Sequence, residues 1–263
     1  MSLSRRDLLR AGAAAALTAA CAPASSTRAK SPGTTTPSTG ASGAAGSSVP
    51  PTKPTTPATA VPRRPATEVG NGNRSTSTVA LTFHGNGDPA LADRLLSMLE
   101  AHRVKGSVLA VGSWLAAHPD LARRVTSAGH DLGNHTQHHL PMRGLTATHA
   151  YTEISACAEE LRARTGSIGT WFRASGTQRT TPTIRAAAAR AGYARCVSYD
   201  VDGLDWQDPP TATVVRAVLS GAENGSIVSL HLGHPVTIKA LPAILDRLPS
   251  RGLRPVTLTE LLS

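Results

Sequence analysis

Two histidines, His135 and His139, lie four residues apart in the run His-Thr-Gln-His-His. On one turn of a helix, side chains at this spacing face the same way and can bind one metal ion. The pair alone is a weak signal, because histidine-rich turns are often simply solvated. Other polar side chains follow neighbouring predicted strands: His84, Asp88, Arg173, Asp202, Asp205 and His231. Beside them, the histidine pair becomes a candidate metal site.

Short apolar runs alternate with amphipathic stretches along the chain. The predicted strands are 78–83, 107–111, 131–134, 170–173, 195–199, 226–230 and 254–257, and the predicted helices are 89–102, 121–128, 146–165, 181–191, 211–219 and 238–248. Strands that alternate with helices indicate an α/β fold with a largely parallel sheet and right-handed crossovers. About seven such units are compatible with a closed or nearly closed barrel, whose active residues lie just after the strands.

The first 24 residues have the features of an export signal. Arg5 and Arg6 precede a weakly hydrophobic run, residues 11–20, which is too short to be a permanent membrane span. The paired arginines resemble the twin-arginine signal, and residues 18–21 resemble a lipobox in which Cys21 is lipidated. Ordinary signal cleavage with release of the product is the alternative. We therefore expect a lipoprotein on the outer face of the cell membrane, or a protein secreted into the cell wall.

Residues 25–74 are almost wholly Ser, Thr, Pro, Gly and Ala with scattered bases, which predicts a disordered linker before a folded domain at 75–263. The formal net charge is +10, but residues 1–74 hold nine of the 27 bases and only two of the 17 acids. The domain itself thus has 18 bases and 15 acids, without a basic stripe. This distribution excludes nucleic acid as a partner and favours an anionic membrane or wall near the basic tail.

The domain contains two cysteines, Cys157 in a helical pattern and Cys196 in a strand pattern. Outside the cytoplasm they could form a disulfide, but two small buried thiols are the favoured interpretation. Four further histidines are predicted to be surface residues: His102, His118, His130 and His149.

Five segments resemble, in order and spacing, the motifs of the polysaccharide deacetylase family (NodB-homology domain, carbohydrate esterase family 4). Residues 134–139 match its His-(Ser/Thr)-x-x-His metal motif, which is the strongest match. Residues 202–206 match Asp-x-x-Asp-Trp, and 230–231 match the terminal Leu-His. Residues 172–176 resemble the Arg-Pro-Pro-Tyr-Gly groove motif without its prolines, and 82–83 begin like Thr-Phe-Asp-Asp-Gly.

The resemblance implies a distorted (β/α)7-type barrel with one divalent metal, zinc first and cobalt or nickel as alternatives. The metal would polarise an acetyl carbonyl and lower the pKa of a bound water. The residue roles that it implies are metal ligands at His135 and His139, a general acid at His231, an organiser of the base at Arg173, and an orienter of charged neighbours at Asp205 or Asp202. The substrate groove would include Trp206, Ser175 and Gly176.

The first motif departs from the family pattern. Where the family has two adjacent aspartates, the base and then a metal ligand, this chain has His84 and Gly85. Asp88, on a loop between glycines, could fold back to bind the metal and leave His84 as the base. Alternatively, His84 binds the metal and Asp88 is the base. A decayed site is the third interpretation, and the retained histidines and Arg173 argue against it.

The resemblance implies a hydrolase that removes acetyl groups from a carbohydrate polymer containing N-acetylglucosamine, peptidoglycan or chitin-like, at the cell surface. Its expected partners are this glycan and, through the lipid anchor, the membrane, and a monomer is expected. One alternative is a non-catalytic glycan-binding lipoprotein with a degenerate site, and another is a different metal amidohydrolase on the same barrel. Release of acetate distinguishes the first function from the other two.

Overall fold

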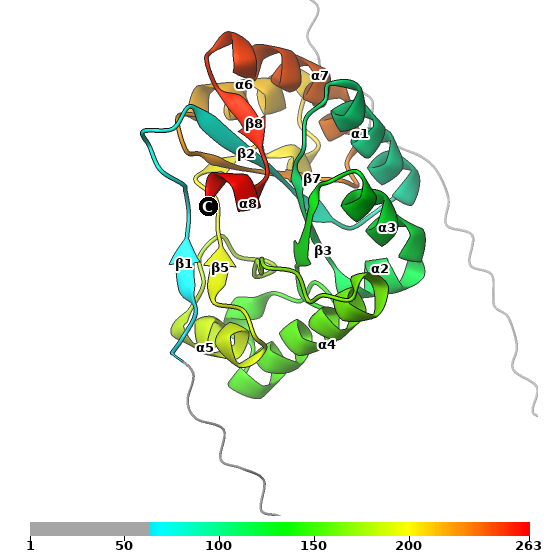
Figure 1. Cartoon of the computed structure of the whole chain (residues 1–263), viewed down its shortest axis with the longest axis vertical. Coiled ribbons are helices and arrows are strands. Elements are labelled where there is room, and N and C mark those ends of the chain that lie inside the picture. Colours follow the sequence, from blue (N-terminus) through cyan, green and yellow to red (C-terminus); the bar gives the residue numbers. More distant parts are fainter. Residues whose placement is uncertain (1–63) are drawn as a thin grey trace, which may run out of the picture. The chain divides into compact units, whose positions relative to one another are not determined.

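In the computed structural model, which describes residues 64–263, parallel strands form the centre and helices surround them (Figure 1). The predicted export signal, the lipidation site Cys21 and most of the predicted linker lie outside the described residues. The main sheet has the order β4 (Asp131–Asn134), β3 (Ser107–Ala110), β2 (Thr78–Gly85), β7 (Ile227–His231) and β6 (Val201–Asp202), with β8 (Arg254–Val256) beside β2. All these pairings are parallel, as the alternation of strands and helices predicts.

A second pair of parallel strands, β1 (Thr67–Val69) and β5 (Arg195–Val197), lies beside helix α5 (Pro182–Arg190) (Figure 1). Phe172 connects the two sheets through single parallel bridges to Asn134 and Cys196. The strand predicted at 170–173 is therefore reduced to one bridging residue, and the barrel wall is irregular at this point.

The folded unit begins before residue 75, so the predicted end of the linker is wrong. The backbone N–H of Thr67 donates to the carbonyl of Ala194 at 3.0 Å, and that of Ser198 donates to the carbonyl of Val69 at 2.7 Å. Ala66, just before β1, is buried. Composition alone predicted a linker here, because a three-residue strand adds too little apolar sequence to stand out.

The six predicted helices are present, and four of them begin with proline at the first position, where its missing N–H costs nothing. The helices are α1 (Pro89–Ala101), α2 (Gly112–Ala117), α3 (Pro119–Ser127), α4 (Ala147–Thr165), α5 (Pro182–Arg190), α6 (Thr211–Gly221), α7 (Pro235–Ser250) and α8 (Leu258–Leu261), with 3-10 turns η1 (Met142–Gly144) and η2 (Asp205–Gln207). Helices α2 and α8 and strand β6 were not predicted, because each is too short to show a periodic pattern.

The core lies between the sheet and the outer helices. Leu81 and Phe83 of β2 and Leu230 of β7 are completely buried, as are Leu95 and Leu99 of α1. Burying one such side chain stabilises the fold by about 1.5–3 kcal/mol. The core therefore makes the ends of β2 and β7 a rigid base for the side chains that follow them.

Cys157 and Cys196 are buried free thiols, and burial raises the pKa of both to about 12. Trp114 and Trp171 are also buried. The surface prediction is wrong for His130, which is only 7% exposed. Its Nδ1 accepts a hydrogen bond from the backbone N–H of Gly106 at 3.0 Å, so it braces the turn that precedes β3.

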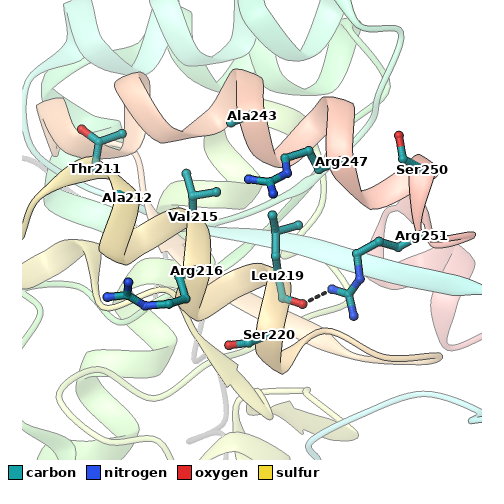
Figure 2. Close-up of a pocket in the computed structure, with 10 residues that line it drawn as sticks. All are labelled: Thr211, Ala212, Val215, Arg216, Leu219, Ser220, Ala243, Arg247, Ser250 and Arg251. Atoms are coloured by element: carbon teal, nitrogen blue, oxygen red, sulfur yellow. Dashed lines mark hydrogen bonds between the residues drawn. The ribbon is translucent and has the colours of Figure 1, made fainter.

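Helices α6 and α7 enclose a surface groove of about 700 Å³, shown in Figure 2. Its floor includes Val215 and Leu219, and the side chains of Arg216, Arg247 and Arg251 border it. None of the predicted site residues lines this groove, so it is separate from the candidate site. Among residues 64–263, no helix combines the length and the apolar character that crossing a membrane requires.

Candidate metal and catalytic site

Three histidines meet where β2 and β4 end. His84 in β2, His135 directly after β4 and His139 four residues later each offer a ring nitrogen, and these atoms lie within 4.8 Å of one another. The ring centroids of His84 and His135 are 4.3 Å apart, and those of His135 and His139 are 4.9 Å apart. Three imidazoles converging in this way are a typical ligand set for a zinc ion that keeps a fourth position open.

The orientation of His135 fits a metal ligand. Its Nδ1–H donates to the backbone carbonyl of Arg173 at 2.9 Å, which leaves the lone pair on Nε2. This Nε2 is buried and has no hydrogen-bond partner within the described chain. In metal-binding histidines, the ring nitrogen that does not bind the metal donates a hydrogen bond of this kind, which fixes the tautomer and the orientation of the ring. A bound cation would satisfy an atom that is otherwise costly to bury.

The electrostatics of the cluster keep its imidazoles neutral. Burial is the main cause that holds the pKa of His84 and His135 well below the ordinary value of 6.5, and the neighbouring histidines add to the shift. The pKa of His139 is lowered for the same reasons. Neutral imidazole is the form that binds metal, so the site is ready to bind a cation at neutral pH.

The lowered pKa values predict a pH-dependent stability of the metal-free protein. Below pH 6.5, His84 and His135 are protonated in the unfolded chain but remain neutral in the folded chain. Because the unfolded chain binds more protons, the free energy of unfolding falls as pH falls. Each group contributes up to about 1.4 kcal/mol per pH unit. Urea unfolding at pH 7.5 and 5.5 with a chelator measures this, and His135→Gln should show a shallower slope. Equal stability at both pH values would contradict the prediction.

The loop that carries His135 and His139 is held from two sides. The Asn134 side chain accepts from the backbone N–H of Thr136 at 2.8 Å, and buried Glu153 of α4 accepts from both the backbone N–H (2.8 Å) and Nδ1 (2.7 Å) of His138. Thr136 and His139 have positive φ angles of 69° and 58°, conformations that persist only when neighbours enforce them. Glu153 was not predicted to be a site residue, although an acid at an apolar position of a helical pattern is a usable signal.

Arg173 is buried below this loop. Its guanidinium donates to the hydroxyl of Thr82 at 2.9 Å and to the carbonyls of Val197 and Ser198 at 3.2 and 3.1 Å. Burial lowers its pKa to about 10, so it stays charged at neutral pH. Its side chain thus ties β2 to the last residue of β5 and the residue that follows, while its carbonyl orients His135.

His231 is half-buried and pairs with the fully buried Asp205 beside the histidine cluster. The Nδ1–H of His231 donates to one carboxylate oxygen of Asp205 at 2.8 Å. The other oxygen accepts from the backbone N–H of His231 at 2.7 Å and from the hydroxyl of Thr237 at 2.5 Å. The His84 ring centroid is 4.4 Å from that of His231. This arrangement fixes the tautomer of His231 and directs its Nε2 lone pair away from Asp205.

The two other predicted acids lie outside the cluster. The Asp88 carboxylate is exposed and caps α1 by accepting from the backbone N–H of Ala90 at 2.9 Å. In this structure Asp88 is therefore not among the candidate metal ligands, because its carboxylate caps the N-terminus of α1 instead. Asp202 accepts from the backbone N–H of Leu204 at 2.9 Å and favours the charged form of Arg173.

The predicted groove residues border the site. Trp206 is 52% exposed and follows Asp205 directly. The Ser175 hydroxyl is buried, 2.5 Å from the carbonyl of Leu140 and 2.9 Å from the hydroxyl of Thr136, so it supports the loop that carries His135 and His139. Gly176 has a φ of 64°, and a Cβ there would lie 2.9 Å from Cα of Pro141. Ser175 and Gly176 thus support the residues around the groove through their packing against Thr136, Leu140 and Pro141.

Gly85 has a packing reason to lack a side chain. A Cβ at this position would lie 2.9 Å from Cγ1 of Val108 and 3.0 Å from Cα of Ala110. Gly85→Asp, which introduces the second aspartate of the family motif, should therefore destabilise the fold by about 1–3 kcal/mol. Urea unfolding measures the effect. Gly144→Asp is the matched control, because nothing lies within 4 Å of a Cβ there. Equal stability of the two variants would contradict the prediction.

Comparison with known proteins gives a consistent result. Residues 71–196 match the polysaccharide deacetylase family. A chitooligosaccharide deacetylase of Bradyrhizobium sp. (strain ANU 289) is 30% identical over 67% of this chain and 87% of the relative. A peptidoglycan-N-acetylglucosamine deacetylase of Listeria monocytogenes is 27% identical over 72% of this chain, which spans only 39% of that relative. The uncharacterized protein YlxY of Bacillus subtilis is 28% identical, and this chain spans 59% of its length.

Solved structures agree on the fold. A family 4 carbohydrate esterase from Streptomyces lividans, in complex with acetate, has a TM-score of 0.63 and 28% identity over 71% of this chain and 93% of that chain. A family 4 pseudoenzyme from Bacillus anthracis has a TM-score of 0.70 and 24% identity over 76% of this chain and 70% of that chain. With the motif residues gathered at one end of the barrel, these likenesses lead to one conclusion: the chain belongs to the polysaccharide deacetylase family.

Proposed function

We propose that this protein is a metal-dependent hydrolase that removes acetyl groups from a glycan containing N-acetylglucosamine, outside the cell. The observation that carries the proposal is the buried Nε2 of His135, which has no hydrogen-bond partner among residues 64–263, in a ring that offers a ligand atom within 4.8 Å of ligand atoms on His84 and His139. The names of the relatives, chitooligosaccharide and peptidoglycan-N-acetylglucosamine deacetylase, support the substrate class.

We assign the metal to His84, His135 and His139, with zinc preferred because three imidazoles suit it. When bound, the ion would polarise the acetyl carbonyl and lower the pKa of a water molecule. In this arrangement His84 takes the place of the missing carboxylate ligand. Gly85 leaves room for β3 instead of carrying that ligand.

His231 transfers the proton in this proposal. Because its Nδ1–H is held by Asp205, neutral His231 presents a lone pair at Nε2 and can accept the proton of the attacking water. It then returns that proton to the nitrogen of the leaving amine. Asp205 stabilises the imidazolium that forms between these two steps. Asp88, capping α1, is not needed in this scheme.

A non-catalytic glycan-binding lipoprotein is the second candidate, favoured by the absence of both first-motif aspartates at His84 and Gly85. The experiment that separates the two measures acetate released from N-acetylchitooligosaccharides and from peptidoglycan fragments, before and after chelation and again after zinc is restored. Acetate release that follows the metal supports the hydrolase. Bound glycan without any acetate release would replace it with the second candidate.

The location outside the cell remains part of the proposal. It is supported by the twin-arginine-like and lipobox-like residues before Cys21. Mass spectrometry of the full chain from membranes would detect a lipid on Cys21. The unmodified soluble form, with cleavage elsewhere, would indicate secretion.

A further inference from the structure

A second histidine–aspartate pair lies next to the His231–Asp205 pair. The Nδ1 of His234 is 3.0 Å from Oδ1 of Asp208, and the ring centroids of His231 and His234 are 5.4 Å apart. Each member of the second pair follows its counterpart by three residues. The two pairs therefore repeat one arrangement, the first with a buried aspartate and the second with an exposed one.

The second pair differs from the first in exposure. The His234 side chain is 29% exposed and that of Asp208 is 59% exposed, whereas Asp205 is completely buried. The Nδ1–H of His234 donates to the carboxylate, and no hydrogen bond among residues 64–263 engages its Nε2. His234 thus presents an oriented, accessible nitrogen beside the catalytic histidine.

The backbone around this pair is held in an unusual shape. Leu204 and Asp208 bracket the 3-10 turn η2 with φ angles of 59° and 48°. Gly233, directly before His234, packs against the first-motif loop so closely that a Cβ on it would lie 2.9 Å from Cα of Gly87. Strained conformations of this kind persist where the surrounding structure enforces them and cluster at functional sites.

The exposed apolar side chains also border the site. Within the described residues, the large hydrophobic side chains that are exposed are Leu140 at 43% and Trp206 at 52%. Leu140 follows His139, and Trp206 precedes Asp208 by two residues. A binding site for a small polar molecule combines apolar surface with a few fixed polar groups. Trp206 of η2 supplies a flat face for a pyranose ring, and His234, held by the residue that caps this turn, supplies a polar group.

From this arrangement we infer that His234, held by Asp208, binds a polar group of the sugar unit next to the one that loses its acetyl group. The inference rests on the proposed function for the identity of the glycan. Hydroxyl and acetamido groups both suit the free Nε2, which accepts a hydrogen bond from O–H or N–H in its neutral form. His234 and Asp208 are then substrate-binding residues that select for a polymer over a single acetylated unit.

The test compares His234→Ala, Asp208→Ala and the double variant with the wild-type full chain. The polymer probe is penta-N-acetylchitopentaose, and the small probe is 4-nitrophenyl acetate, which cannot reach a neighbouring subsite. We expect His234→Ala to raise KM for the pentasaccharide about 10-fold, as the loss of one hydrogen bond to substrate would. Its kcat, and both constants for the small ester, should stay at wild-type values.

Two comparisons make the experiment specific. The double variant should be no worse than His234→Ala, because Asp208 acts through His234. His102→Ala is the matched control: His102 also contacts an aspartate on the surface, Asp246, at 3.5 Å, and should leave KM unchanged. An unchanged KM in His234→Ala, or an equal effect on the small ester, would overturn the subsite.

Calorimetric binding of the pentasaccharide to the metal-free chain separates this inference from the proposed function. A wild-type chain that releases no acetate, but binds the pentasaccharide about 10-fold more tightly than His234→Ala does, would keep the subsite and reject the hydrolase. Absence of binding in the wild-type chain would reject the subsite.

Discussion

Replacing His135 with alanine should reduce bound zinc from about one ion per chain to almost none and abolish acetate release. The effect is large because the Nε2 of His135, the proposed ligand atom, is buried without a partner among residues 64–263, and its ring is already oriented by the carbonyl of Arg173. Metal analysis of the purified full chain after dialysis against zinc measures the result, and acetate release measures its consequence.

Two further variants keep this prediction sharp. His139→Ala removes a proposed ligand that is more exposed than His135, so a loss of zinc in this variant cannot be assigned to a collapsed core. His149→Ala removes an exposed histidine of α4 and should leave the metal content unchanged. Full zinc occupancy in both His135→Ala and His139→Ala would reject the three-histidine site.

Replacing His231 with alanine should leave zinc bound but slow acetate release by about 10²- to 10⁴-fold, the usual contribution of one acid–base group. His231 is the group that carries the proton from water to the leaving amine in the proposed scheme. Its loss should therefore lower kcat much more than it changes KM. Initial rates over a range of pentasaccharide concentrations, on zinc-loaded protein, provide both constants.

Asp205→Asn is the companion variant. It keeps the shape of the side chain but removes the charge that accepts from His231 and Thr237. We expect a smaller loss of kcat than in His231→Ala, because the imidazole remains present but is less well stabilised when protonated. Wild-type rates in zinc-loaded His231→Ala would remove this residue from the chemistry.

The sequence alone determined most of the architecture. Apolar runs alternate with helical patterns because each strand and helix must bury one face, and that pattern is local. It therefore predicted β4 at its observed bounds and α1 within one residue. The same pattern placed the histidines and acids after strands, and in a parallel sheet those ends lie at one edge.

Tertiary structure decided which role each side chain at these strand ends has. The Asp88 side chain could be read as a ligand or as a helix cap, and its position before Pro89 is typical of a cap. In the folded chain its carboxylate accepts from the backbone N–H of Ala90 and caps α1. The pairing of His84 with His231 across β2 and β7 follows from strand register, which no single segment encodes.

The contacts that make the site specific join residues far apart in the sequence. Arg173 reaches Thr82, Glu153 holds His138, and His234 meets Asp208 through loops whose shapes depend on one another. Residue type and spacing therefore identified the family and the candidate ligands. The choice among the possible roles required the tertiary fold, because burial and hydrogen bonding are set by neighbours distant along the chain.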